Sequence, residues 1–189
     1  MLQFAEAQPI LGYADPKNAL PKLIIESEEA AFQSINGFGR RRGNNRIVSL
    51  GNTAFPRLEQ TLSRALTTAV RISDPKLFLQ IEGGGLEMHS DPVIVVTWQI
   101  QASKAWRVHD AALMPDDMLA LRVAQDTPIA AQLLSEFYST LPAENAFEFT
   151  LGPGDFLVIP AFAPHETRAL GDGISISFTL DFVSNGPLS

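Results

Sequence analysis

The second half of the chain is a succession of short apolar segments separated by turn residues, and this restricts the fold to a class built mainly from β-strands. The clearest segment, 174–182, follows the Gly171-Asp172-Gly173 turn and alternates apolar with small polar residues. Alternation with period two is typical of a strand that has two different faces. Further strands are expected at residues 77–81, 93–100, 104–109, 147–151, 156–160 and 165–170. About seven or eight short strands with glycine-rich turns predict a barrel or jelly roll.

Helical patterns interrupt the strands at two places. Residues 56–70 carry apolar side chains at steps of three and four, which predicts a helix with one apolar face. A second helix is expected near 128–140, within a helical insert that covers about 112–145. Towards the N-terminus we expect a short strand at 23–25, a helix that begins at Ser27 and a polar loop from Arg40 to Asn45.

The length and composition fit a single globular domain. The chain has 189 residues, of which 46% are hydrophobic and 19% are charged, and a chain of this size can bury a core without cross-links. We therefore expect one mainly β domain over residues 1–189. Its first part, 1–75, would be mixed α/β support, and 76–182 would be the jelly-roll core that carries the insert.

Composition also restricts the partners. The net charge of −7 argues against nucleic acid, although Arg40, Arg41, Arg42 and Arg46 form a basic cluster that is either a solvated loop or an anion contact. The absence of cysteine excludes disulfides and thiolate ligands. No apolar run of membrane-spanning length and no secretory signal is visible, so we expect a cytoplasmic protein with no membrane partner. The oligomeric state stays open, and a homodimer is compatible with the sequence.

Three residues carry the donor groups of a metal site. His89 and Asp91 stand two positions apart, so on an extended segment both side chains point to one side while Ser90 points away. His165 lies far downstream, after a turn bounded by Pro164. Two imidazoles and one carboxylate form the set that holds Fe(II) and leaves positions open for oxygen and a co-substrate. The sequence predicts this site if the fold brings the three together; otherwise each histidine is an ordinary hydrogen-bonding residue.

The roles of two further residues are less restricted by the sequence. Lys104 begins the expected strand at 104–109, and if it points into a barrel beside Trp106 it needs an anionic partner or loses its charge. The alternative is an exposed lysine in a hairpin. His109 ends the same strand and is expected either to be structural or to face the substrate.

Four spaced motifs between residues 77 and 182 resemble one known family. They are Gly85-x-x-x-His89-x-Asp91, Gln99-x-x-x-x-Lys104-x-Trp106, Leu151-Gly152-Pro153-Gly154-Asp155-x-x-x-Ile159-Pro160-x-x-x-Pro164-His165 and Ser175-x-Ser177-Phe178. Together they are similar to the JmjC and cupin-like Fe(II)- and 2-oxoglutarate-dependent oxygenases. The resemblance is to the hydroxylase branch that acts on amino-acid side chains.

The resemblance implies a double-stranded β-helix, which is a form of jelly roll, and an active site within it. His89, Asp91 and His165 would hold Fe(II) and form the catalytic centre. Lys104 would bind the 5-carboxylate of 2-oxoglutarate, and the arginine that does this in another branch is absent, because position 175 is Ser. The implied reaction is hydroxylation, by O2, of an amino-acid side chain in a protein, a peptide or a small molecule, with succinate and CO2 as co-products.

The polar groups that accompany the carboxylate anchor in relatives are not all present in this sequence. Thr97, Gln99 and Ser177 are candidates for binding the co-substrate, because strand parity places them on one face. Two other functions stay open. One is a metal-dependent cupin enzyme that does not use 2-oxoglutarate, which would need more histidine ligands and could include His109. The other is a non-enzymatic jelly-roll module that binds a peptide or sugar.

Overall fold

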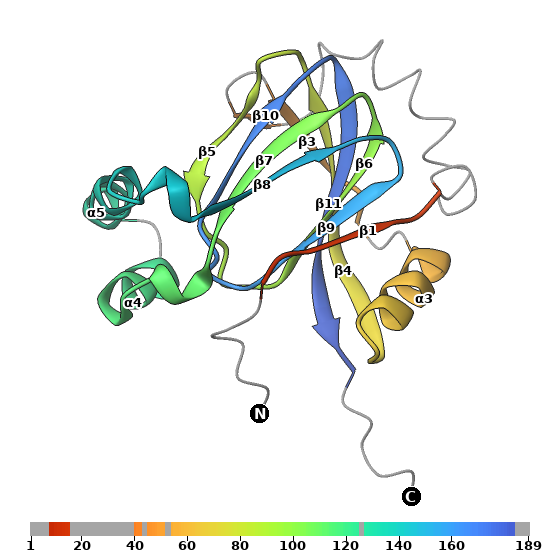
Figure 1. Ribbon diagram of the computed structural model, residues 1–189, viewed down its shortest axis with the longest axis horizontal. Coiled ribbons are helices and arrows are strands. Elements are labelled where there is room, and N and C mark those ends of the chain that lie inside the picture. Colours follow the sequence, from red (N-terminus) through yellow and green to blue (C-terminus); the bar gives the residue numbers. More distant parts are fainter. Residues whose placement is uncertain (1–7, 16–39, 43–44, 52–53, 125–126, 184–189) are drawn as a thin grey trace, which may run out of the picture.

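Two antiparallel sheets make up most of this computed structural model, which describes residues 8–15, 40–42, 45–51, 54–124 and 127–183 (Figure 1). The strands are β1 (Ile10–Tyr13), β2 (Arg40–Arg42), β3 (Asn45–Ser49), β4 (Val70–Gln80), β5 (Gly85–His89), β6 (Val95–Gln101), β7 (Lys104–His109), β8 (Ala146–Leu151), β9 (Asp155–Ile159), β10 (His165–Ala169) and β11 (Gly173–Phe182). The larger sheet has the order β1-β9-β6-β11-β4-β3-β2, and the smaller has the order β5-β10-β7-β8. The fold is mainly β and is a jelly roll, as the strand pattern predicts.

Within the described residues, three α-helices accompany the sheets: α3 (Pro56–Ala65), α4 (Asp116–Ala124) and α5 (Pro128–Ser139). Helix α5 begins where expected, because the Thr127 side chain accepts a hydrogen bond from the Ala130 N–H and Pro128 occupies the first turn. Helices α4 and α5 form the insert between β7 and β8, and Figure 1 shows them together beside the end of β5. No helix among the described residues is long and apolar enough to cross a membrane.

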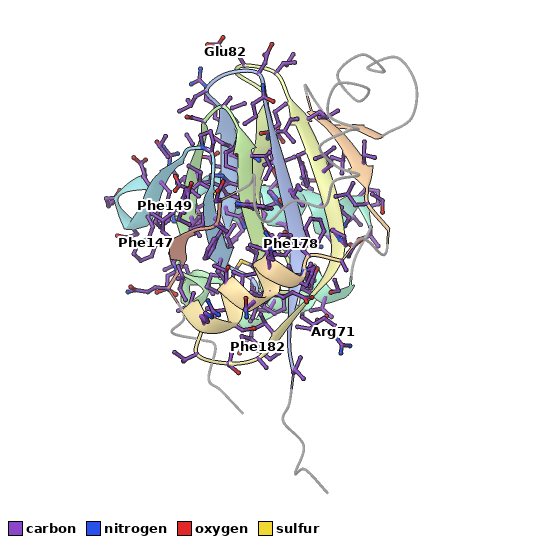
Figure 2. The ribbon with its side chains drawn as sticks, turned by 90° about the vertical axis from the view of Figure 1, so that its right-hand side faces the viewer. Arg71, Glu82, Phe147, Phe149, Phe178 and Phe182 are labelled. Carbon is purple, nitrogen blue, oxygen red and sulfur yellow. The ribbon has the colours of Figure 1, made fainter. Side chains whose placement is uncertain are left out.

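The main apolar core lies on the face of the larger sheet that points away from the smaller one. Ile174, Ile176 and Phe178 of β11 belong to one buried cluster with Leu58 and Leu62 of α3. Figure 2 shows α3 lying across this face of the sheet, with Phe178 beside it. Because side chains alternate along a strand, the small polar residues of β11 point to the other face, between the sheets. The helix therefore buries the apolar face, and the space between the sheets is left to accept polar groups.

A smaller apolar cluster closes part of the space between the sheets. It joins Trp106 and Val108 of β7 to Leu157 and Ile159 of β9. Since β7 belongs to the smaller sheet and β9 to the larger, these side chains hold the two sheets together. Several of the other positions between the sheets carry buried polar side chains, among them Lys104, Thr97 and Gln99, and they matter for the site described below.

Close contact between β5 and β10 depends on a glycine. A Cβ at Gly85 would collide with the carbonyl oxygen of Thr167 on the neighbouring strand. Only glycine allows this approach. At the other end of the same strand pair, beyond an irregularity between His165 and Thr167, His89 at the end of β5 lies opposite His165 at the start of β10.

Some expected boundaries differ from the structure. The polar loop predicted from Arg40 to Asn45 is wrong at both of its ends, because β2 and β3 pair there and β3 extends the sheet from β4. Backbone pairing at a sheet edge does not require apolar side chains, so composition alone misled the prediction. The expected helix 56–70 ends at Ala65. The predicted strand at 23–25 and the helix beginning at Ser27 lie outside the described residues.

Candidate metal centre

The structure brings His89, Asp91 and His165 together at the mouth formed by β5 and β10. Each residue offers one donor atom, and these atoms lie within 4.8 Å of one another. Asp91 Oδ2 is 3.6 Å from His165 Nε2 and 4.0 Å from His89 Nε2. Adjacent ligand atoms around an ion with bonds of about 2.1 Å lie roughly 3 Å apart, so a contraction of less than about 1 Å at these two contacts closes them around an ion.

Backbone carbonyl groups orient both imidazoles. His89 Nδ1 lies 2.7 Å from the Glu87 carbonyl oxygen, and His165 Nδ1 lies 2.8 Å from that of Ala163. A carbonyl oxygen can only accept, so each Nδ1 carries the proton and each Nε2 presents its lone pair. Metal-binding histidines are commonly fixed in this way. Neither carbonyl could be identified from the sequence, because every residue carries the same backbone acceptor.

The electrostatic setting keeps His165 neutral. Its side chain is buried, and burial together with the neighbouring His89 lowers its pKa to about 4. The carboxylate of Asp91 and the bond to the Ala163 carbonyl act in the opposite direction, and Lys104 adds to the lowering. At neutral pH this imidazole is therefore in the neutral form, with a proton on Nδ1 and a free lone pair on Nε2, that a metal requires.

The turn between the two N-terminal ligands is held by residues that the sequence did not indicate. Ser90 is fully buried and its hydroxyl lies 2.8 Å from the Tyr138 hydroxyl of α5. Its carbonyl oxygen accepts a bond from Arg122 Nε of α4, and Arg122 also pairs with Asp91. The Phe162 N–H donates to the Asp91 carbonyl oxygen at 2.6 Å. Arg122 and Tyr138 are more than thirty positions from His89 and Asp91, so no local pattern could have identified them.

Lys104 points into the space between the sheets beside Trp106. Its side chain is 1% exposed, and its ammonium donates to Ser175 Oγ at 3.1 Å. It also lies over the rings of Trp106 and Phe78, at 4.8 and 5.5 Å from their centroids. No ion pair among the described residues involves Lys104, and burial lowers its pKa to about 7. The exposed-hairpin alternative is thereby excluded, and the only side-chain hydrogen bond of the ammonium among the described residues is the one to Ser175.

Polar side chains of the larger sheet surround this lysine's space. Thr97 and Gln99 are buried on β6, and Ser177 of β11 donates to Thr97 Oγ1 at 3.2 Å. Gln99 Nε2 donates to the Gln101 carbonyl at 2.7 Å, whereas its Oε1 has no partner among the described residues. Gln80 Nε2 is buried and also lacks a partner there. Buried polar atoms without partners are costly, and a polar ligand between the sheets would satisfy them.

The third histidine is placed apart from this group. His109 is 1% exposed, and burial and Arg107 lower its pKa while Glu166 opposes the shift. It is not among the three residues whose donor atoms converge. Its position in the structure therefore fits the structural role better than a place among the metal ligands.

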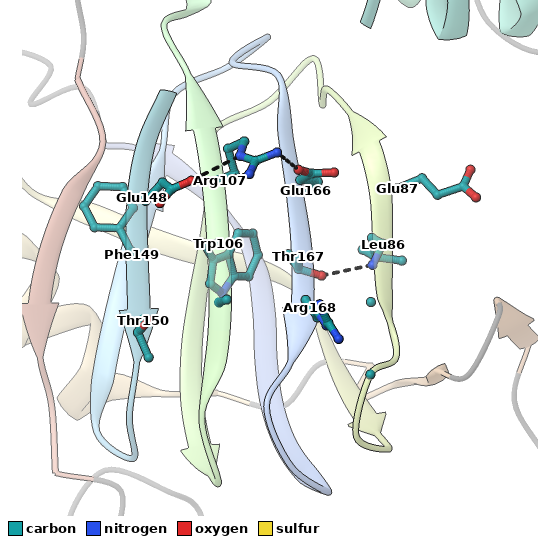
Figure 3. Close-up of a pocket in the computed structure, with 13 residues that line it drawn as sticks. Leu86, Glu87, Trp106, Arg107, Glu148, Phe149, Thr150, Glu166, Thr167 and Arg168 are labelled. Atoms are coloured by element: carbon teal, nitrogen blue, oxygen red, sulfur yellow. Dashed lines mark hydrogen bonds and ion pairs between the residues drawn. The ribbon is translucent and has the colours of Figure 1, made fainter. Parts of the chain in front are cut away.

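A separate open groove of about 600 Å³ lies on the smaller sheet (Figure 3). Arg107 spans three strands there, because its guanidinium pairs with Glu166 at 2.7 Å and with Glu148 at 3.3 Å. None of the three converging residues lines this groove, and neither does Lys104. The groove is therefore not the site formed by the triad.

Comparison with known proteins identifies the family of this chain. A family model described as the JmjC domain matches residues 54–186. No curated protein is significantly similar in sequence. Solved structures with similar folds include YcfD, a ribosomal oxygenase from Escherichia coli in complex with cobalt and succinic acid, at 20% identity and a TM-score of 0.46. That match covers 81% of this chain and 36% of the oxygenase, so the chain spans about a third of the larger protein.

Two other solved structures match the chain at lower identity. A cupin superfamily protein from Desulfitobacterium hafniense DCB-2 is 12% identical with a TM-score of 0.41, and the match covers 76% of this chain and 83% of that protein. The oxalate decarboxylase from Lactobacillus farciminis, in its formate complex, is 15% identical with a TM-score of 0.41, over 77% and 30% of the two chains. The family model covers most of the chain, and the protein therefore belongs to the JmjC domain family.

Proposed function

We propose that the protein is an Fe(II)- and 2-oxoglutarate-dependent oxygenase that hydroxylates an amino-acid side chain in a protein, peptide or small molecule. The observation that carries the proposal is the convergence of two imidazoles and one carboxylate at one point, with a buried lysine between the same two sheets. Membership of the JmjC domain family supports it.

The residues present fit the metal and the co-substrate. His89 and His165 present Nε2 atoms whose tautomer is fixed, and Asp91 presents one oxygen, which is the donor set that suits Fe(II) with positions left open. When bound, iron and 2-oxoglutarate supply the oxidation, in which O2 and the co-substrate yield succinate, CO2 and a hydroxylated product.

The chain's own groups bind and orient the co-substrate. Lys104 would be protonated when a carboxylate lies against it, and it would donate a charge-assisted bond in place of, or beside, its bond to Ser175. Such a bond contributes roughly 1.5–3 kcal/mol. The unpartnered amide atoms of Gln80 and Gln99 are further candidates for contact. Trp106 supplies an apolar wall that excludes water.

A direct test replaces the triad one residue at a time. His89→Ala and Asp91→Ala are each expected to reduce conversion of 2-oxoglutarate to succinate to background, because both remove a metal ligand. His109→Gln is the matched control, and it should retain turnover if the histidine is not a ligand. A triad variant that turns over 2-oxoglutarate at the wild-type rate would exclude the proposed centre, and a wild-type protein that binds iron but consumes no 2-oxoglutarate would favour other cupin chemistry.

A further inference from the structure

The carboxylate of Asp91 divides its two oxygens between different partners. Oδ2 faces the imidazoles, at 3.6 Å from His165 Nε2 and 4.0 Å from His89 Nε2. Oδ1 lies 3.4 Å from Arg122 Nη2. One oxygen is therefore directed to the metal position, while the other is paired with a cation on α4.

The same arginine also holds the residue next to the ligand. Arg122 Nε donates to the Ser90 carbonyl oxygen at 2.5 Å, so two different nitrogens of one planar guanidinium contact adjacent residues. Ser90 is in turn bonded through its hydroxyl to Tyr138 of α5. Both helices of the insert thus attach to the turn that carries Asp91, and Figure 1 shows them at that end of β5.

These contacts restrain the rotation of the Asp91 carboxylate, which determines whether Oδ2 points to the metal position. A carboxylate rotates about its terminal torsion over a broad range. A charge-assisted bond to Oδ1 limits this rotation, and the bond to the Ser90 carbonyl fixes the guanidinium from which it comes. Oδ2 then stays directed toward the imidazoles before any ion arrives. Groups that orient a metal ligand in this way commonly alter metal affinity by about 10–100-fold when they are lost.

We propose that Arg122 is a positioning residue that presents Asp91 to the metal, and that Tyr138 supports it through Ser90. The inference rests on the proposed function, because it concerns the same centre. It assigns the helical insert a part in building the metal site, although none of the insert's described residues is among the three converging side chains.

The test measures metal affinity directly, without turnover. Wild type, Arg122→Met, Arg122→Lys and the control Arg64→Met are titrated with Mn²⁺ by calorimetry, since Arg64 is exposed on α3. Arg122→Met is expected to weaken Mn²⁺ binding by about 10-fold or more. Arg122→Lys should recover part of the affinity, because it keeps the charge near Asp91 but cannot hold both partners in one planar fork. Arg64→Met should bind as wild type does.

Cobalt provides a spectroscopic readout of geometry. Co²⁺ bound to Arg122→Met should show a changed visible spectrum, because Asp91 is then free to rotate or to bind through both oxygens. Tyr138→Phe removes one hydroxyl only and should weaken Mn²⁺ binding by about threefold, with the exposed Tyr13→Phe as control. If Arg122→Met does not fold, Arg122→Lys and Tyr138→Phe decide the question.

The outcomes separate this inference from the proposed function. If wild type binds Mn²⁺ while Arg122→Met has equal or higher affinity and an unchanged cobalt spectrum, the positioning role is overturned and the oxygenase proposal stands. If wild type binds neither ion, the proposed centre itself fails. Weakened binding in Arg122→Met and Tyr138→Phe, with both controls unchanged, supports the inference.

Discussion

Lys104 is a buried ammonium whose counter-charge is not supplied by the described residues. Burial lowers its pKa from the ordinary 10.5 to about 7, so above neutral pH the amine of the free protein is mostly uncharged. A carboxylate placed beside it favours the charged form and raises the pKa again. At a pH between the pKa of Lys104 in the free protein and its higher pKa in the complex, the free protein holds fewer protons than the complex does. Binding of an anionic co-substrate is therefore linked to proton uptake.

We expect 2-oxoglutarate binding at pH 8 to take up about 0.9 proton, because an amine with a pKa near 7 is about one-tenth charged at that pH and fully charged in the complex. Anaerobic calorimetry with Mn²⁺ in buffers of different ionisation enthalpy measures this number. Lys104→Met should bind 2-oxoglutarate more weakly and with no uptake, whereas the exposed Lys76→Met should behave as wild type. Equal uptake in wild type and Lys104→Met would place the anchor elsewhere.

Helix α3 packs into the main apolar core and supplies none of the three residues of the candidate metal centre. Leu58 and Leu62 are fully buried against the outer face of the larger sheet. Leu58→Ala should lower the free energy of unfolding by about 2–5 kcal/mol, because the cavity it leaves can relax only in part. Urea denaturation measures the change, with the exposed Leu170→Ala as control. Metal affinity of the folded variant should match wild type; a loss of affinity would show that α3 is coupled to the centre.

Strands β6 to β11 were predictable because alternation is a local property, whereas β4 begins at Val70, well before the expected start at residue 77. The expected bounds of β7 agree with the structure, and those of β10 agree to within one residue. The sequence pattern did not predict which neighbouring element each face of a strand packs against. The apolar side of β11 packs on α3 rather than towards the smaller sheet, and only the position of that helix decides it. The edge pairing of β2 with β3 was missed because it depends on β4.

At the scale of the whole molecule, the sequence indicated the candidate ligands and the lysine between the sheets, but not the groups that orient those ligands. Histidine and aspartate at metal-ligand spacing are visible in a sequence, and the resemblance supplied the distant partner. The groups that orient these ligands come from the Glu87 and Ala163 carbonyls and from Arg122. They are either backbone atoms or side chains brought close by the insert. Tertiary structure alone places them, so sequence patterns could not identify them.

Because His165 lies far along the chain from His89 and Asp91, the three candidate ligands converge only in the folded state, and a metal should stabilise the whole fold. An ion that binds the native state alone adds about 2.7 kcal/mol when its free concentration is 100 times Kd. For a chain of this length the melting temperature should then rise by roughly 5–10 °C. Differential scanning fluorimetry with Mn²⁺ tests this, and a chelator should reverse it.

The matched variant for this measurement is His165→Ala. For each protein, the quantity compared is the increment that Mn²⁺ adds to that protein's own melting temperature. The increment should disappear, because the His89 and Asp91 pair that remains supplies only two ligand atoms. Ca²⁺, which prefers oxygen ligands, should stabilise wild type much less than Mn²⁺ does. An equal Mn²⁺ increment in wild type and His165→Ala would mean that the ion binds elsewhere, and the convergence of the three side chains would then have no functional consequence.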